Sequence, residues 1–134
     1  MKYAFDFHGV LQKYPKIFMP MMIDLMKSGN FVSVLSGPTK TQVAWELTQA
    51  GYVRGVHYAH IISVVDWLHF QKQNRGAEFD MWKNDRGTWM TDHDTWWSSK
   101  SKICREFDID VMFDDQEEYS KYIVDERPVF FHVK

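Results

Sequence analysis

The sequence predicts an α/β fold with a mainly parallel sheet, and three observations lead to that prediction. First, the chain contains short apolar runs that are long enough for buried strands and too short for helices. These runs lie at residues 3–5, 31–35, 61–65 and 109–113. Second, segments with helical spacing separate the runs, and strands that alternate with helices form parallel sheets with right-handed crossovers. Third, the 134 residues are 45% apolar and 25% charged, which is typical of one globular domain, here residues 1–134.

The composition also excludes several classes of partner. The formal net charge is −2, without the strong basic bias that proteins binding duplex nucleic acid normally show. The chain has no run of about 18 apolar residues that could span a membrane, and no charged-then-apolar leader segment. Cys104 is the single cysteine, which excludes an internal disulfide and fits a reducing compartment. We therefore expect a cytoplasmic protein whose partners include neither duplex nucleic acid nor a membrane.

The first strand ends in a polar turn. Its apolar run stops at Asp6, and His8 and Gly9 follow within the next three residues. A carboxylate at the carboxyl end of a first strand lies where open α/β sheets bind ligands. Gly9 allows a backbone turn that lets a substrate approach the main chain closely. The alternative is that Asp6 serves only the chemistry of the turn.

A helix is expected between the first and the second strand. Residues 12–16 form a loop, and residues 18–27 place methionine and leucine side chains at helical spacing. Pro20 lies near the start of this segment and Gly29 follows its end. Proline in the first turn and glycine after the last turn are the usual boundaries of a helix.

The second strand leads into an expected anion site. Ser36 and Gly37 follow its apolar run directly. Thr39 and Gln42 form a capping box, and the helix that they open runs to about Ala50. A hydroxyl and free backbone N–H groups at a helix N-terminus form a site for an anion. The alternative is an ordinary strand–loop–helix joint with no ligand.

A hairpin insert interrupts the alternation of strands and helices. After the third strand, residues 66–73 form a short helix, and the segment at 74–99 then changes pattern. An Asn-Asp-Arg-Gly turn lies between two stretches of alternating apolar and polar residues, which predicts a β-hairpin. Trp82 and Trp89 lie on its two arms. We expect the insert to be a flap over a binding site or, alternatively, to close an edge of the core.

The last third of the chain supplies the remaining polar residues. We expect helices at 102–106 and 117–122 and a closing strand at 128–133. Between the two helices, the strand at 109–113 ends in Asp114 and Asp115. Lys100 and Lys102 lie at the start of the first of these helices.

In a parallel sheet these polar residues share one edge, because the carboxyl ends of the strands all lie there. The set comprises Asp6, Ser36, Lys100 or Lys102, Asp114 and Asp115. Carboxylates suit Mg²⁺, which usually also shares oxygens of a substrate phosphate. The lysine and the serine would hold the phosphoryl oxygens, and one aspartate would attack. The residues therefore predict a Mg²⁺-dependent phosphoryl site.

The order of these residues resembles the haloacid dehalogenase-like (HAD) hydrolase superfamily over nearly the whole chain. The first motif of that family is Asp-x-Asp-Gly-[Thr/Val], and the second is a Ser or Thr that ends the second strand. The third is a Lys at a helix start, and the fourth is an acidic pair that ends the following strand. The matching segments are Asp6-Phe7-His8-Gly9-Val10, Ser36-Gly37, Lys100 with Lys102 close behind, and Asp114-Asp115. His8 stands where the family's phosphatases carry their second Asp.

The resemblance implies a three-layer Rossmann-like core and a mechanism. Asp6 would be the nucleophile and would form an aspartyl-phosphate that water then hydrolyses. His8 would take the place of the Asp that acts as general acid and base, since imidazole changes protonation near neutral pH. The implied Mg²⁺ ligands are Asp6, the backbone carbonyl of His8, and one or both of Asp114 and Asp115.

The resemblance also implies how the substrate is held. The implied phosphate-binding residues are Ser36, Gly37 and Lys100, with Lys102 as the alternative lysine. The insert at 74–99 lies in the second place where this family puts caps, and its size suits a flap. Trp82 and Trp89 would then contact the substrate, because aromatic faces offer a large contact area for a base or a sugar.

Three functions follow from this sequence. The first is a Mg²⁺-dependent phosphohydrolase acting on a small phosphorylated metabolite or nucleotide. The second is a HAD-like binding or regulatory protein with weak or no turnover, because His8 replaces the usual second Asp. The third is a receiver-type signalling domain, whose acidic pair belongs after the first strand, whereas here it follows the fourth apolar run. Dehalogenation fits less well, because the pair Asp114-Asp115 favours a metal and a phosphate.

Overall fold

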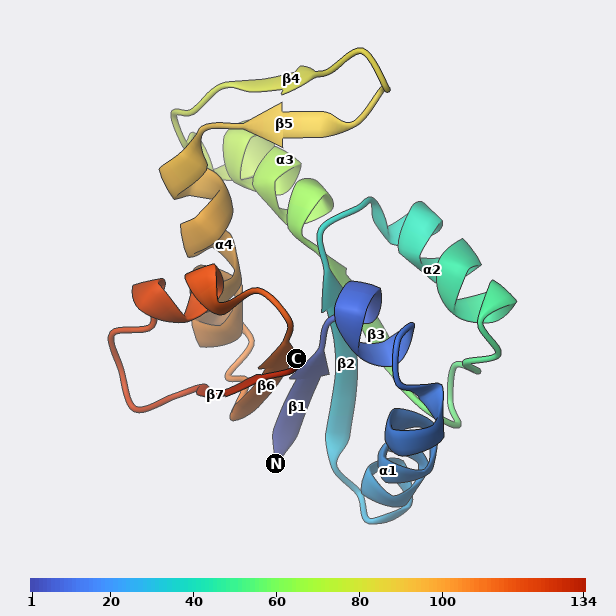
Figure 1. The fold of residues 1–134 in the computed structure, drawn as a ribbon. Helices are drawn as coiled ribbons and strands as arrows, with labels where there is room; N and C mark the ends of the chain where they lie inside the picture. The colour runs from blue at the N-terminus through green and yellow to red at the C-terminus, as the bar shows by residue number, and fades with distance from the viewer.

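A five-stranded parallel sheet forms the centre of the protein (Figure 1). The computed structural model describes residues 1–134. In spatial order the strands are β3 (His60–Ser63), β2 (Phe31–Ser36), β1 (Lys2–Phe5), β6 (Val111–Asp114) and β7 (Val129–His132). Every neighbouring pair runs parallel. The predicted α/β fold with a mainly parallel sheet is therefore confirmed.

Helices cover both faces of the sheet and give three layers (Figure 1). They are α1 (Pro15–Lys27) and α2 (Lys40–Gln49) on one face, and α3 (Val64–Arg75) and α4 (His93–Glu106) on the other. Successive side chains of a strand point to opposite faces, so Phe5 of β1 meets the first pair of helices and Ala4 meets the second pair. None of the helices has the length and apolar character that crossing a membrane requires.

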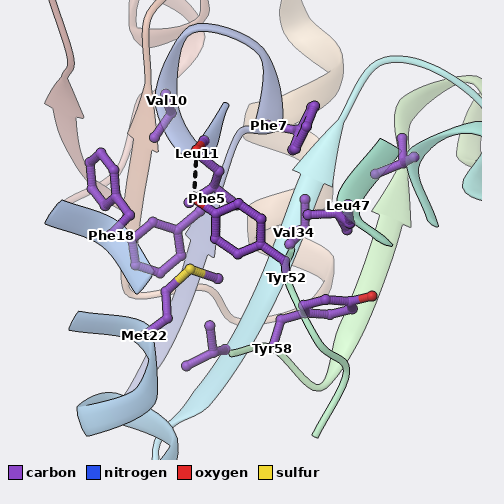
Figure 2. Close-up of a cluster of buried hydrophobic side chains, with 12 residues drawn as sticks. Phe5, Phe7, Val10, Leu11, Phe18, Met22, Val34, Leu47, Tyr52 and Tyr58 are labelled. Carbon is purple, nitrogen blue, oxygen red and sulfur yellow. Dashed lines mark hydrogen bonds between the residues drawn. The ribbon is translucent and has the colours of Figure 1, made fainter. Parts of the chain in front are cut away.

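The first hydrophobic core lies between the sheet and the pair α1 and α2 (Figure 2). Phe5 stacks on Phe113 with the ring centroids 4.8 Å apart, and meets Phe18 edge-on at 5.7 Å. The hydroxyl of Tyr52 donates a hydrogen bond to the backbone oxygen of Leu11. Burying a phenylalanine side chain contributes about 1.5–3 kcal/mol. This core therefore fixes the end of β1 and the turn after it, where Asp6 lies.

The second hydrophobic core lies under α3 and α4. Leu68 of α3 and Ile103 of α4 pack there with Ala4 and Leu35 of the sheet. Cys104 is buried in the same cluster, and burial raises the pKa of its thiol to about 12. The cluster holds α4, the helix that carries Lys100, against the sheet.

Three helices begin earlier than predicted, and for α1 and α3 the difference is three and two residues. α1 begins at Pro15 instead of residue 18, because a backbone N–H at the first position of a helix has no partner within the helix, and proline lacks that group. Pro20, which was expected near the start of the helix, therefore lies inside it. α3 begins at Val64 because the hydroxyl of Ser63 accepts a 3.0 Å hydrogen bond from the backbone N–H of Asp66 and caps the helix. The third strand accordingly ends at Ser63 and not at residue 65.

The hairpin is present but shorter than the predicted insert at 74–99. Its strands are β4 (Met81–Lys83) and β5 (Trp89–Thr91), which pair antiparallel. α3 continues to Arg75, and α4 begins at His93 instead of residue 102, so only residues 76–92 lie outside helices. Asp92 caps α4, since its Oδ2 atom accepts a 3.0 Å hydrogen bond from the backbone N–H of Thr95.

The strand order reverses between β1 and β6. From β1 the chain proceeds to β2 and β3 on one side, and β6 and β7 lie on the other side. Open α/β sheets bind ligands in the crevice outside the carboxyl ends of the strands at such a reversal. Phe5 pairs with Phe113, so the next residues, Asp6 and Asp114, leave the two strands side by side.

Candidate functional site

Three carboxylates meet at the reversal of strand order. Asp6, Asp114 and Asp115 each offer a carboxylate oxygen, and these atoms lie within 4.8 Å of one another. The backbone N–H of Asp6 donates a 2.9 Å hydrogen bond to the oxygen of Phe113, which fixes the start of the turn to β6. Asp114 Oδ1 accepts a 2.9 Å hydrogen bond from the backbone N–H of Gln116. The structure thus brings the three predicted aspartates together, in a group that could hold a metal ion.

Lys100 is buried among these carboxylates. Its Nζ atom lies 2.5 Å from Oδ2 of Asp114 and 3.4 Å from Oδ1 of Asp6, and the residue is only 2% exposed. Nζ also lies 4.4 Å from the ring centroid of Tyr119, in the 3₁₀-helix η2 (Glu117–Tyr122). Burial alone would lower the pKa of Lys100, but the charges of Asp6 and Asp114 outweigh it and raise the pKa above its ordinary value. Lys100 therefore stays an ammonium ion.

Lys102 does not join the cluster. Two residues along an α-helix rotate the side chain by about 200°, because one turn takes 3.6 residues. Lys102 is exposed and lines a small hollow together with Trp67 and Thr95. Of the two predicted lysines, the structure therefore places Lys100 beside the carboxylates and Lys102 elsewhere.

Burial raises the pKa of Asp6 from 3.8 to about 6. The ammonium group of Lys100 opposes this rise, whereas the negative charges of Asp114 and Asp115 add to it. Asp6 is only 6% exposed, so the loss of hydration is nearly complete. The carboxylate is therefore mostly ionised at neutral pH and takes up a proton in mildly acidic solution.

Ser36 ends β2 close to Asp6, and its hydroxyl is a buried group without a partner. Ser36 is completely buried, and its Oγ atom makes no well-formed hydrogen bond to any protein atom. The hydroxyl lies near the Asp6 carboxylate, and the weak hydrogen-bonding contact between them lowers the pKa of Asp6 slightly against the effect of burial. Buried hydroxyls are normally hydrogen-bonded, so an unpaired one beside a carboxylate is available to a ligand. Gly37 follows it and packs against Trp96, whose ring a Cβ atom on Gly37 would approach to 3.1 Å.

Gly9 lets the carboxylate of Asp115 approach the turn after β1. Its φ of 75° is in the left-handed region that glycine adopts readily. A Cβ atom at this position would overlap the Asp115 carboxylate. On the other side, Nε2 of His132 lies 3.0 Å from the backbone oxygen of Asp115. The absence of a side chain at Gly9 is therefore part of the geometry that brings the third aspartate into the cluster.

The side chain of His8 contacts α2. Its Nε2 atom lies 2.8 Å from Oε2 of Glu46, and the imidazole is 45% exposed. Oε1 of Glu46 accepts a 2.9 Å hydrogen bond from the side chain of Gln42. Half of the predicted capping box is therefore present, because the backbone N–H of Gln42 donates to Thr39 while its side chain turns to Glu46. The sequence did not point to Glu46, which belongs to no motif.

A cleft of about 530 Å³ lies between the tip of the hairpin and the loop after β2. Gly37 lines one wall, and Arg86 and Trp89 line the other. Trp82 does not line this cleft and is 48% exposed. Of the two predicted flap residues, only Trp89 therefore borders it. The hairpin itself lies beyond the carboxyl ends of the strands (Figure 1).

Comparisons with known proteins give no counterpart of this site. The sequence matches no protein-family model, and neither curated protein sequences nor solved structures give a significant match. The resemblance to HAD hydrolases therefore rests on the four motifs of this chain.

A metal ion bound at the carboxylate cluster should compete with the proton of Asp6. Because the pKa of Asp6 is raised to about 6, the ion must displace a proton below that pH and meets a free carboxylate above it. We expect the dissociation constant of Mg²⁺ or Mn²⁺, measured by calorimetry, to rise about tenfold from pH 7 to pH 5. The Asp6→Asn variant should bind more weakly and without this pH dependence. Equal affinity of the parent at both pH values would contradict the assignment.

Replacing Gly9 with alanine should disturb the cluster through two effects. The left-handed conformation costs a residue with a Cβ about 1–2 kcal/mol, and the methyl group would displace the Asp115 carboxylate. We expect Gly9→Ala to lower the thermal midpoint and to weaken Mn²⁺ binding at least tenfold. Gly29→Ala is the matched control, because Gly29 also has a left-handed φ, of 82°, but a Cβ atom there would contact nothing. Equal loss of metal affinity in both variants would show that Gly9 has no special role.

Proposed function

We propose that this chain is a Mg²⁺-dependent phosphohydrolase of the HAD-like type, which acts on a small phosphorylated metabolite or nucleotide through an aspartyl-phosphate. The observation that carries the proposal is the buried ammonium of Lys100, ion-paired to Asp6 and Asp114 beside the unpaired hydroxyl of Ser36. If these ion pairs served only the fold, a buried hydroxyl without a hydrogen-bond partner beside them would bring no benefit. A phosphoryl group would accept hydrogen bonds from both Lys100 and Ser36.

Asp6 is the proposed nucleophile. One of its carboxylate oxygens attacks the phosphorus atom, a phosphorus–oxygen bond to Asp6 forms, and the bond to the leaving oxygen breaks. Water then attacks the same phosphorus atom, releases inorganic phosphate and restores the carboxylate. Lys100 and Ser36 donate to the phosphoryl oxygens in both steps, and no bulk water competes with them because both side chains are buried.

The donor set fits a hard divalent cation. Three carboxylates against one ammonium leave an excess of negative charge in a buried site, and carboxylate oxygen is the ligand that Mg²⁺ prefers. The side chains of Asp6, Asp114 and Asp115 and the backbone carbonyl of His8 would hold the ion. When bound, Mg²⁺ would neutralise charge on the phosphoryl oxygens.

His8 is the proposed acid and base. With Nε2 at Glu46, the Nδ1 atom is the ring nitrogen left to exchange a proton with the leaving oxygen. The ring would donate this proton as the phosphorus–oxygen bond breaks and would take a proton from the attacking water in the second step. Glu46 is a positioning residue in this scheme, since it orients the imidazole without touching the substrate.

The second candidate function is a binding or regulatory protein with the same phosphate site and little turnover. The contact between His8 and Glu46 also favours this candidate, because a side chain held by α2 is partly withdrawn from reaction. The two candidates share every residue of the phosphate site and differ only in what His8 does. Variants of His8 therefore separate them.

Asp6→Asn should remove turnover while preserving the fold. We expect hydrolysis of p-nitrophenyl phosphate to require Mg²⁺, to stop with EDTA and to fall about 10³-fold or more in this variant, because the amide cannot form the acyl phosphate. Asp24→Asn is the matched control, since Asp24 is an exposed residue of α1. Activity that survives both EDTA and Asp6→Asn would refute the nucleophile.

His8→Ala should lower kcat about 10²-fold, at the low end of what general acid–base catalysis supplies, whereas His8→Asp should keep or raise it. Glu46→Gln should lower kcat in the parent and have no effect in the His8→Asp background, because only the imidazole depends on Glu46. Steady-state rates of the four variants test this coupling. If His8→Ala equals the parent and His8→Asp is far more active, the chain is a binding or regulatory protein.

A further inference from the structure

The cleft beside the hairpin is lined by the residue that follows the serine of the proposed phosphoryl site. Gly37 lines the cleft and directly follows Ser36, whose buried hydroxyl lies beside Asp6. A phosphate ester held by Ser36 and Lys100 would have this hollow one residue away, on the side of Gly37, for its leaving group. The volume of about 530 Å³ lies within the range of about 300–1,000 Å³ that is usual for small-molecule sites.

The lining of the cleft has a definite chemical character. It contains two indole rings, from Trp89 and Trp96, and one cation, Arg86. It contains hydrogen-bonding side chains, such as that of Gln42, and no carboxylate. A flat, neutral or anionic group with several hydrogen-bonding atoms suits these walls, whereas a cationic group finds no counter-ion.

The tip of the hairpin holds Arg86 in a defined turn. Oδ1 of Asn84 accepts hydrogen bonds from the backbone N–H groups of Arg86 at 2.9 Å and of Thr88 at 3.0 Å. Gly87 supplies the left-handed conformation of the turn, with a φ of 74°. The guanidinium of Arg86 makes no ion pair within the chain, although seven other basic residues do. A cation without a partner, carried on an ordered turn at the rim of a cleft, is available to a ligand.

Trp89 is fixed by its neighbours. The ring of His69 meets it edge-on with the centroids 4.5 Å apart, and Nζ of Lys83 lies 5.1 Å from the ring centroid. Trp96 is fixed on α4 against Gly37. Rigid aromatic rings bind a flat partner with little loss of conformational entropy.

We propose that the cleft binds a nucleoside and that the substrates of this chain are nucleoside monophosphates. The proposal rests on the proposed function for the phosphate end of the substrate and on the cleft for the other end. The base lies against the indole rings, and Arg86 and Gln42 contact the oxygen and nitrogen atoms at its edge. A sugar phosphate without a base leaves the aromatic walls and the guanidinium without a partner.

The test compares substrates that differ only in the base. For the parent, we expect kcat/KM for adenosine or uridine monophosphate to exceed that for ribose 5-phosphate about ten- to hundredfold, which is what stacking of one base supplies. Arg86→Gln and Trp89→Leu should each remove at least three-quarters of this preference, by lowering kcat/KM for the nucleotides more than kcat/KM for ribose 5-phosphate. Trp45→Leu and Arg105→Gln are the matched controls, because both residues are exposed outside the cleft.

Each failure has its own meaning. If ribose 5-phosphate is hydrolysed as well as the nucleotides, the inference is overturned while the proposed function stands. If no ester is hydrolysed, the proposed function fails, and calorimetry with the parent then decides the inference: binding of adenosine monophosphate tighter than ribose 5-phosphate supports it, and equal binding overturns it. Should Trp89→Leu not fold, Arg86→Gln, at an exposed turn, carries the same comparison.

Discussion

The buried ion pairs of Lys100 are the interaction on which the rest of the site depends. Removing charged groups from water costs several kcal/mol per ion, and only close pairing offsets that cost. Nζ of Lys100 lies 2.5 Å from Asp114 and 3.4 Å from Asp6, so loss of the ammonium would leave two buried carboxylates without a counter-ion. Such a loss costs about 3–5 kcal/mol. Helix α4 is therefore held in the one rotational setting that presents Lys100 to the ends of β1 and β6.

The apolar layers determine where this polar group lies. Ile103 and Cys104 follow Lys100 by three and four residues, so all three side chains share one face of α4, and the two apolar ones anchor that face in the second core. In the same way, Phe5 is buried in the first core immediately before Asp6. Lys100 and Asp6 are thus brought to the crevice by apolar neighbours whose burial stabilises the fold.

The strand ends could be predicted from the sequence, and the choice between the two lysines could not. Apolar runs that stop at Asp6 and Asp114 locate both residues at one sheet edge whatever the helices do. The choice of Lys100 depends on which face of α4 packs against the sheet. The predicted helix began at residue 102, nine residues after the observed start at His93, and so did not include Lys100. The contact between His8 and Glu46 depends on how α2 packs on the turn after β1, a tertiary relation that leaves no local pattern.

The site divides its titratable groups between two environments, although Asp6 and His8 are only two residues apart. Asp6 is buried beside Lys100, whereas His8 is half-exposed beside Glu46. In enzymes, groups whose environments differ in this way take different parts of a proton-transfer reaction. A nucleophile needs a fixed, water-poor position, and an acid that serves first the leaving group and then water needs contact with solvent. In the proposed function, His8 meets the second need with its side chain and contributes only its backbone carbonyl to the metal, so imidazole in place of carboxylate is compatible with the rest of the site.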